Sequence, residues 1–265
     1  MLRFKACGLS DVGLTRLHNE DYFEIDPRHK LYVVADGMGG HSYGEIAAQM
    51  AVRAIHEFID RATDRDTTWP MKMDDRLERH SNILRMAVRK AHDTVLTAIS
   101  KDGSLHGMGT TVVGLLLSGA TAAVAHVGDS RAYRLRNGRL DQLTQDHTWV
   151  HEQVIAGLLS KEQARSHPLK NVVTRALGGE SEVVVDVREV KVQPGDLYLL
   201  CSDGLTGMLS DADLRERLGS GRSLHEICRG LVNDANARGG LDNVTVVLLA
   251  VEEGGEGGDG DDESE

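Results

Sequence analysis

Three apolar segments in the middle of the chain follow one another with almost no sequence between them. They read GTTVVGLLL, TAAVAHVGD and RAYRLRNGRL, at residues 109–117, 121–129 and 131–140. A parallel pair of strands needs a crossover of about a dozen residues or more, so these segments are expected to be antiparallel strands. Asn137-Gly138 is a typical two-residue hairpin turn. The sequence therefore argues against an all-parallel sheet.

Helical periodicity flanks this strand-rich region on both sides. Apolar residues recur at intervals of three and four in residues 44–60, 77–100 and 224–235, and residues 147–165 are also helical in character. Other apolar runs, bounded by glycine and polar residues, are expected to be strands: 31–37, 182–190, 196–204 and 243–251. Helices early and late in the chain, with antiparallel strands between them, predict one α+β domain in which helices are layered on sheets.

Composition limits the class of protein. A chain of 265 residues with 40% hydrophobic side chains can bury a sizeable core, and only 4% are aromatic, so aliphatic residues must fill it. The formal net charge of −11 argues against nucleic acid as the main partner. Part of this charge lies in the glycine-rich acidic stretch 252–265, which is expected to be a disordered tail.

Location is predicted from what the sequence lacks. The first residues, MLRFKACGLS, contain no long apolar segment of a signal peptide, and no segment approaches the roughly 18 apolar residues that span a bilayer. The cysteines are Cys7, Cys201 and Cys228, an odd number spaced far apart. They fit a reducing compartment better than a disulfide framework or a zinc site, so we expect a cytoplasmic protein that does not enter a membrane.

Four acidic residues share one local pattern. Asp36, Asp129 and Asp203 each follow an apolar strand at a glycine-containing turn, and Asp242 directly precedes one. Asp-Gly is common turn chemistry, and one such residue alone would be interpreted that way. Four carboxylates at the ends of packed strands would instead meet at the rim of a sheet and repel one another. A divalent cation would remove this conflict.

The type of ligand indicates which cation. The acids offer only oxygen, which favours Mg²⁺ or Mn²⁺ over Zn²⁺. Glycine beside Asp36 would also let a backbone carbonyl approach a metal. Two metals about 3.5–4 Å apart, bridged by a carboxylate, can activate water and neutralise charge on a phosphoryl group. Arg16 supplies a guanidinium that could grip two phosphate oxygens, although Arg16 taken alone is better explained by a surface ion pair.

A series of motifs in a fixed order carries a family resemblance. In chain order they read RLHNEDYF, VVADGMGGHSYGEIAA, GMGTTVVGLLL, VAHVGDSRAYRLRNG, LTQDHTWV, NVVTRALGG, YLLCSDGLTGMLSD and LDNVTVVLL. Each motif is weak alone, but the ordered set resembles the bacterial branch of the metal-dependent protein phosphatases, the protein phosphatase 2C family. The resemblance covers residues 5–251. It implies a catalytic domain over residues 1–251, folded as a four-layer α-β-β-α sandwich, with a mobile flap at about 146–180 beside the site.

The resemblance also implies roles for individual residues. It makes Asp36 the carboxylate that bridges two Mn²⁺ or Mg²⁺ ions, and it makes Gly37 a ligand through its backbone carbonyl. The remaining implied residues are Asp203 and Asp242 as direct ligands, Glu20 holding a metal-bound water, Asp129 at a third and weaker metal site, and Arg16 as the phosphate-binding residue.

The implied reaction is hydrolysis of phosphoserine and phosphothreonine in proteins. Water bridging the two metals would attack phosphorus in line, without a phosphoenzyme. The eukaryotic branch has a histidine directly after its Asp-Gly as the proposed general acid, and this chain has Met38 there. His41 could protonate the leaving alkoxide, or a metal-bound water could. A serine/threonine kinase or its targets would be natural partners of a monomeric enzyme of this type.

Three other functions can be compared with the sequence. Gly40–Gly44 matches G-x-S-x-G, but Ser42 stands six residues after the end of the apolar strand, and His225 lies in a helical pattern, so a Ser42, Asp203, His225 triad is disfavoured. A cysteine phosphatase needs an arginine six positions after its cysteine, and none of the three cysteines has one. A catalytically inactive binding module would be expected to lack a metal aspartate, yet all the expected acids are present.

Overall fold

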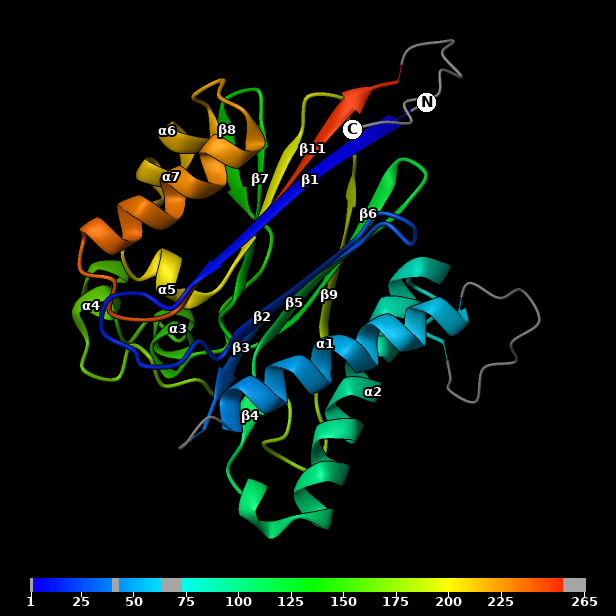
Figure 1. The fold of residues 1–265 in the computed structure, drawn as a ribbon, viewed down its shortest axis with the longest axis vertical. Helices are drawn as coiled ribbons and strands as arrows, with labels where there is room; N and C mark the ends of the chain where they lie inside the picture. Colours follow the sequence, from blue (N-terminus) through cyan, green and yellow to red (C-terminus); the bar gives the residue numbers. More distant parts are fainter. Residues whose placement is uncertain (1, 40–42, 63–72, 255–265) are drawn as a thin grey trace, which may run out of the picture.

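Two antiparallel β-sheets form the middle of the structure, which a computed structural model describes for residues 2–39, 43–62 and 73–254 (Figure 1). The first sheet has the strand order β1-β11-β10-β7-β8, and the second has the order β2-β3-β5-β6-β9, with β4 paired to β3. The strands of the first sheet are β1 (Leu2–Asp11), β7 (Arg131–Arg136), β8 (Arg139–Gln142), β10 (Leu197–Cys201) and β11 (Val244–Glu253). Those of the second are β2 (Asp21–Asp26), β3 (Leu31–Met38), β4 (Gly109–Thr110), β5 (Val112–Ser118), β6 (Thr121–Val127) and β9 (Asp186–Lys191).

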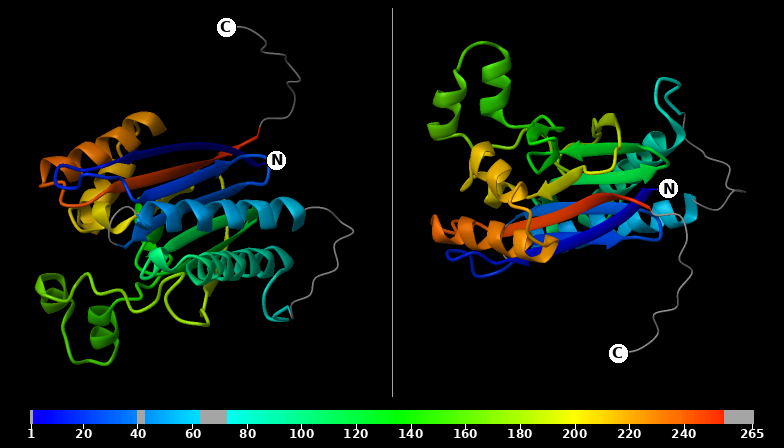
Figure 2. Two further views of the ribbon diagram at one scale, coloured as in Figure 1. Left: turned by 60° about the horizontal axis from the view of Figure 1, so that its bottom comes forward. Right: turned by 90° about the horizontal axis from the view of Figure 1, so that it is seen from above.

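Helices cover both outer faces of the stacked sheets (Figures 1 and 2). The long helices α1 (Tyr43–Ala62) and α2 (Arg79–Lys101) pack on the second sheet, and the short η1 (Gly103–Leu105) follows them. The helices α5 (Asp203–Thr206), α6 (Asp211–Leu218) and α7 (Leu224–Ala237) cover the first sheet. This arrangement confirms the predicted α+β class and the four-layer α-β-β-α sandwich.

Three hydrophobic clusters fill the three spaces between the four layers. Strand β3 shows how the sequence produces this packing, because neighbouring side chains of a strand point to opposite faces. Val33 and Ala35 face helices α1 and α2, whereas Tyr32 and Val34 face the other sheet. A strand that is buried on both faces has to be apolar at every position. The run LYVVA therefore ends at the first residue that leaves the core, Asp36.

The predicted pairing of neighbouring strands is only partly correct. Strands β5 and β6 pair antiparallel as expected, and Asn137-Gly138 joins β7 to β8 with both residues at positive φ. Strands β6 and β7, however, belong to different sheets. The chain crosses between the sheets at Gly128, whose φ of +105° and 2.5 Å clearance from Thr111 exclude a side chain. This crossing places Asp129 at the rim between the two sheets.

Other differences concern element boundaries. Strands β1 and β2 were not predicted, and β4 and β5 are separated at Thr111 rather than continuous. The helical segment 147–165 forms two short helices, α3 (Trp149–Ile155) and α4 (Lys161–Ser166), which lie outside the four layers (Figure 2). The acidic tail from residue 255 lies outside the described residues. Among the described helices, none is both long enough and apolar enough to cross a bilayer.

Candidate metal centre

The four predicted aspartates come from both sheets and gather at one rim between them. Asp36 lies at the end of β3, Asp129 in the crossing after β6, Asp203 after β10, and Asp242 before β11. Burial raises the pKa of Asp36 most. Repulsion from Asp21 raises it further, followed by repulsion from the other three aspartates. Asp203 in turn interacts with both Asp242 and Asp36. The residues that the sequence separates by up to about two hundred positions therefore form one pocket of carboxylates.

The pocket contains a fifth carboxylate, Asp21, which is not among the predicted site residues. Asp21 pairs directly with Asp36 across the β2–β3 ladder and is almost fully buried. Its Oδ2 accepts a hydrogen bond of 2.7 Å from the Ser202 hydroxyl, whereas its buried Oδ1 has no partner in the described structure. Buried polar atoms are rarely left unpaired, so Oδ1 indicates that a further group, such as a water or an ion, belongs in this pocket.

The raised pKa values of these acids follow from their burial and from their crowding in the pocket. Burial raises the pKa of Asp21 to about 7, and the neighbouring Asp203 and Asp242 add to the effect. Burial likewise raises the pKa of Asp129 to about 8, followed by repulsion from Asp203 and Asp146. The pKa of Asp203 is also raised, first by burial and then by Asp242. Without a counter-charge, several of these groups would hold protons at neutral pH.

Close backbone packing explains the glycines after Asp36. A side chain on Gly37 would start 2.1 Å from the carbonyl oxygen of Gly44, and one on Gly44 would start 2.7 Å from Glu20 Oε1. The Gly37 amide donates to the Glu20 carbonyl at 3.1 Å, and the first turn of α1 donates a backbone hydrogen bond from Gly44 to the Glu20 carboxylate. Glycine at both positions therefore lets Glu20, the end of β3 and the start of α1 meet.

Arg16 reaches the same rim from the loop between β1 and β2. Its Nη2 donates to Asp242 Oδ2 at 2.7 Å, and its half-exposed side chain is also attracted by Glu20 and Asp36, which raises its pKa. Asn243 fixes this loop, because its amide donates to the Val12 and His18 carbonyls while its oxygen accepts from the Glu20 amide. The guanidinium is thus held beside the carboxylates with half of its surface open to solvent.

The other residues considered for catalysis or metal binding differ in their positions. His41 and Ser42 lie outside the described residues. His225, the histidine of the alternative triad, lies with its Nδ1 3.2 Å from Cys7 Sγ, on the α7 side of the first sheet. All three cysteines are buried and free, as small core residues would be. Asp146, next to Asp129, is paired by both oxygens with Arg131 at 2.6–3.1 Å and is therefore less available to an ion.

Comparison with known families identifies the family to which the fold belongs. Residues 15–242 match the family model described as protein phosphatase 2C. The chain belongs to the protein phosphatase 2C family. This membership confirms the predicted phosphoprotein phosphatase, and the match spans every predicted acid, from Glu20 to Asp242.

Individual relatives of this protein phosphatase 2C chain are bacterial. The serine/threonine phosphatase Stp of Listeria welshimeri is 40% identical over 243 residues, which cover 91% of this chain and 93% of the relative. The protein phosphatase PhpP of Streptococcus pneumoniae is 37% identical over 92% of this chain and 96% of its own. The crystal structure of Mycobacterium tuberculosis PstP/Ppp superimposes with a TM-score of 0.83 at 37% identity, covering 95% of this chain and 99% of that one.

One solved relative contains the metal. The catalytic domain of the phosphatase PstP was crystallised in complex with two manganese ions, and it matches 96% of this chain with a TM-score of 0.82 at 35% identity. The residues of the present protein phosphatase 2C chain fit such ions on their own chemistry. The pocket offers only oxygen ligands, its acids are crowded enough to raise their pKa values, and one buried carboxylate oxygen lacks a partner.

Proposed function

We propose that this protein phosphatase 2C member hydrolyses phosphoserine and phosphothreonine in proteins at the carboxylate pocket around Asp36, with Mn²⁺ or Mg²⁺ bound there. One observation carries the proposal: carboxylates from both sheets converge on Asp36 and raise one another's pKa, an arrangement that costs stability unless cations fill it. When bound, such ions supply Lewis acidity and activate water for attack on phosphorus.

The acids of the pocket have distinct positions from which to hold ions. Asp36 interacts with Asp21 and with the other three aspartates, so its carboxylate would be shared between two ions, with the backbone of Gly37 beside it. Asp203 and Asp242 come from the first sheet and close the pocket from the opposite side. Glu20 is oriented by the start of α1 and fits the role of holding a water, and Asp129 is placed for a third ion shared with Asp203.

Asp21 positions this machinery. It is buried behind Asp36, and its bond from Ser202 ties β2 of the second sheet to the residue that directly precedes Asp203. The two sheets therefore keep a fixed separation where their acids meet. Buried carboxylates behind a ligand shell orient the ligands in front of them, which tunes metal affinity.

Arg16 is proposed to bind the phosphate of the substrate. Asp242 holds the guanidinium at the rim, and the exposed half of the side chain leaves donors free for a phosphoryl oxygen. Replacing Arg16 with alanine should raise KM for a phosphopeptide about tenfold and change kcat much less, since a tenfold change corresponds to about 1.4 kcal/mol of binding. Steady-state kinetics with a phosphothreonine peptide at saturating Mn²⁺ measure both constants.

A matched arginine provides the control for Arg16. Arg238 is similarly exposed and forms a two-pronged ion pair with Asp213 rather than with an acid of the pocket, so Arg238→Ala should leave KM unchanged. Arg16→Lys should give an intermediate KM, because an ammonium keeps the charge but loses the planar fork. An unchanged KM in Arg16→Ala would remove phosphate binding from the role of this residue.

Further features of the proposal concern the surroundings of the site. The catalytic domain is proposed to extend over residues 1–251, with 252–265 as a tail. The segment 146–180, which includes α3 and α4, is proposed as a flap that contacts substrate, which its position outside the four layers supports. His41 or a water is proposed as the general acid. The free, buried cysteines support a reducing cytoplasm, where a serine/threonine kinase and its targets would be partners of a monomeric enzyme.

The function is tested by measuring phosphate release from matched phosphoserine and phosphothreonine peptides. Turnover should require Mn²⁺ or Mg²⁺, should disappear in EDTA and should return when excess metal is added. A phosphotyrosine peptide of the same sequence serves as the comparison substrate. Turnover that persists after the chain has been stripped of metal, or the absence of turnover on every phosphopeptide at saturating metal, would contradict the proposal.

A further inference from the structure

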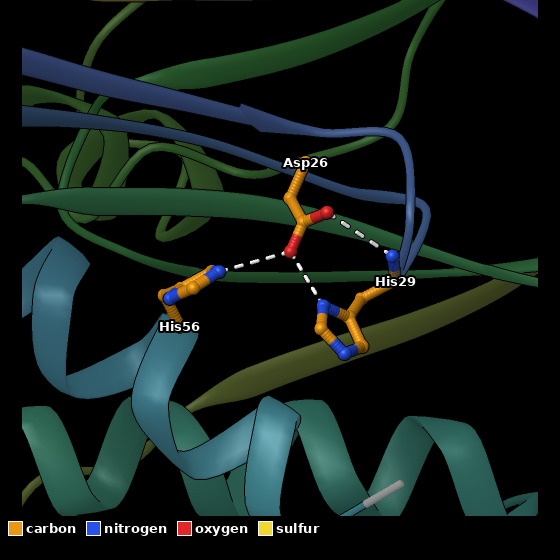
Figure 3. A group of neighbouring side chains, drawn as sticks. All are labelled: Asp26, His29 and His56. Carbon is orange, nitrogen blue, oxygen red and sulfur yellow. Dashed lines mark hydrogen bonds and ion pairs between the residues drawn. The ribbon is translucent and has the colours of Figure 1, made fainter.

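A second set of metal-binding side chains lies at the opposite end of β3 and α1 from the carboxylate pocket. Asp26 ends β2, His29 lies in the turn before β3, and His56 stands on α1, about 18 Å along that helix from Gly44. Figure 3 shows both imidazoles pointing at the same carboxylate. We propose that Asp26, His29 and His56 form a site for a transition metal of the zinc type, separate from the catalytic ions.

The distances between the ligand atoms fit this proposal. Asp26 Oδ2 lies 2.5 Å from His29 Nδ1 and 2.9 Å from His56 Nε2, and the three atoms lie within 4.8 Å of one another. Tetrahedral zinc with bonds of 2.0–2.1 Å keeps its ligand atoms about 3.3 Å apart. Each side chain would therefore move by less than about 1 Å to receive the ion. Two imidazoles with one carboxylate suit Zn²⁺ and its neighbours rather than Mg²⁺.

Hydrogen bonds already hold two of the three ligands in place. The other oxygen of Asp26, Oδ1, accepts from the backbone amides of Arg28 and His29 at 2.9 and 3.2 Å, so Oδ2 remains directed at the imidazoles. His29 Nε2 lies 3.2 Å from Asp60 Oδ1 on α1. A carboxylate on the far nitrogen of a histidine fixes the tautomer whose near nitrogen binds metal. Asp60 therefore gives His29 the support that metal-binding histidines normally have.

Exposure of the third ligand provides access. The side chains of Asp26 and His29 are at most 10% exposed, whereas that of His56 is 39% exposed. An ion can enter past His56 and retain a water in its fourth position. Binding releases the proton shared between Asp26 Oδ2 and His29 Nδ1, together with any proton on His56 Nε2, to solvent. The bound ion would fasten the β2–β3 turn to α1.

A comparable group elsewhere in the described structure lacks these features. His126, His147 and Asp186 also place three ligand atoms within 4.8 Å of one another. There, however, the Arg175 guanidinium lies 3.3 Å from His147 Nε2, the nitrogen that would bind the ion, and also pairs with Asp186. His126 Nε2 is bonded to the Gln145 carbonyl. The Arg175 guanidinium already supplies a positive charge here, and the Nε2 atoms of both histidines already have partners. We therefore interpret this second group as structural.

Zinc stoichiometry tests the proposal. The full chain without an affinity tag is saturated with Zn²⁺, passed through a desalting column and assayed for bound zinc. The wild type should retain one more zinc ion than His56→Ala. His106, an exposed histidine outside both groups, provides the control, and His106→Ala should retain as much as the wild type. Asp60→Asn should weaken the site about 10–100-fold, as loss of an orienting carboxylate does. Equal zinc content in the wild type and His56→Ala would overturn the site.

A spectroscopic measurement tests the site without relying on the folding of His56→Ala. In the Asp36→Asn chain, whose catalytic pocket is weakened as a competitor, one equivalent of Zn²⁺ is examined by X-ray absorption. Two imidazole ligands and one carboxylate are expected. A spectrum with oxygen ligands only, or with one imidazole, would show that the ion prefers another place and would refute the proposal even if His56→Ala failed to fold.

Discussion

Replacing Asp36 with asparagine should abolish turnover of phosphopeptides while leaving the fold intact. Asp36 interacts with Asp21, Asp129, Asp203 and Asp242, so we expect its carboxylate to be shared by the bound ions. Loss of several kcal/mol of charge stabilisation in the transition state corresponds to a fall in kcat of about 10³-fold or more. Steady-state kinetics at saturating Mn²⁺ measure this fall, and calorimetric titration should show weaker binding of Mn²⁺.

The same substitution makes an opposite prediction for stability. Asparagine keeps the shape of the side chain and removes one of several mutually repelling carboxylates, so the metal-free variant should melt at the same temperature as the wild type or higher. Asp93→Asn, on the exposed face of α2, is the control and should keep full activity. Wild-type turnover in Asp36→Asn would remove this residue from the catalytic centre. If this variant misfolds, Asp203→Asn provides the same test from the other sheet.

Local sequence was sufficient to predict the layers because the apolar residues of strands and of helices recur along the chain with different spacings. Strand β3 is apolar at successive positions since both of its faces are covered, and α1 repeats every three to four residues since only one of its faces is covered. The four rim aspartates followed from one shared local pattern, and the family followed from motifs in a fixed order. These are features that neighbouring residues carry, and they survive in the sequence as short patterns.

What the sequence did not indicate depends on contacts between distant segments. Asp21 stands in a polar stretch that resembles a turn, and it becomes a buried acid only because β2 pairs with β3 and Ser202 arrives from the other sheet. Similarly, nothing local distinguishes a hairpin from the crossing at Gly128. The ion pair between Arg16 and Asp242 joins residues 226 positions apart. Register and sheet membership decide all three, and both are properties of the assembled fold.

The metal-free protein should lose stability as the pH rises from about 6.5 to 8.5. In the folded state the pKa of Asp21 is raised to about 7 and that of Asp129 to about 8, mainly by burial, so both carboxyls hold protons there. In the unfolded chain both are ionised above about pH 4. The stability that these groups contribute is therefore fully present below about pH 4, and it is lost as the pH rises from there through the two folded values. Each proton held only by the folded state gives a slope of about −1.4 kcal/mol per pH unit.

The window above pH 6.5 separates this effect from the buried histidines. Burial lowers the pKa of His147 to about 4, followed by repulsion from His126, so His147 contributes stability above pH 6.5 that is lost as the pH falls towards 4. His147 therefore makes the free energy of unfolding rise with pH, whereas the carboxyls make it fall. Most of the stabilisation from His147 is already present at about pH 6.5. Between about pH 4 and 6.5 the two carboxyls outweigh this one histidine, so the metal-free stability contributed by these three groups should fall with rising pH there as well.

Urea unfolding in the presence of a chelator, at several pH values, measures this profile. Asp129→Asn removes one of the titrating groups, so its metal-free stability should decline less between pH 6.5 and 8.5 than that of the wild type. With saturating Mg²⁺ the decline should vanish or reverse, because the ions bind ionised carboxylates and compete with protons for them. A metal-free profile that rises with pH through this window would mean that the acids of the rim are already ionised without ions. The crowding on which the proposed metal centre depends would then be absent.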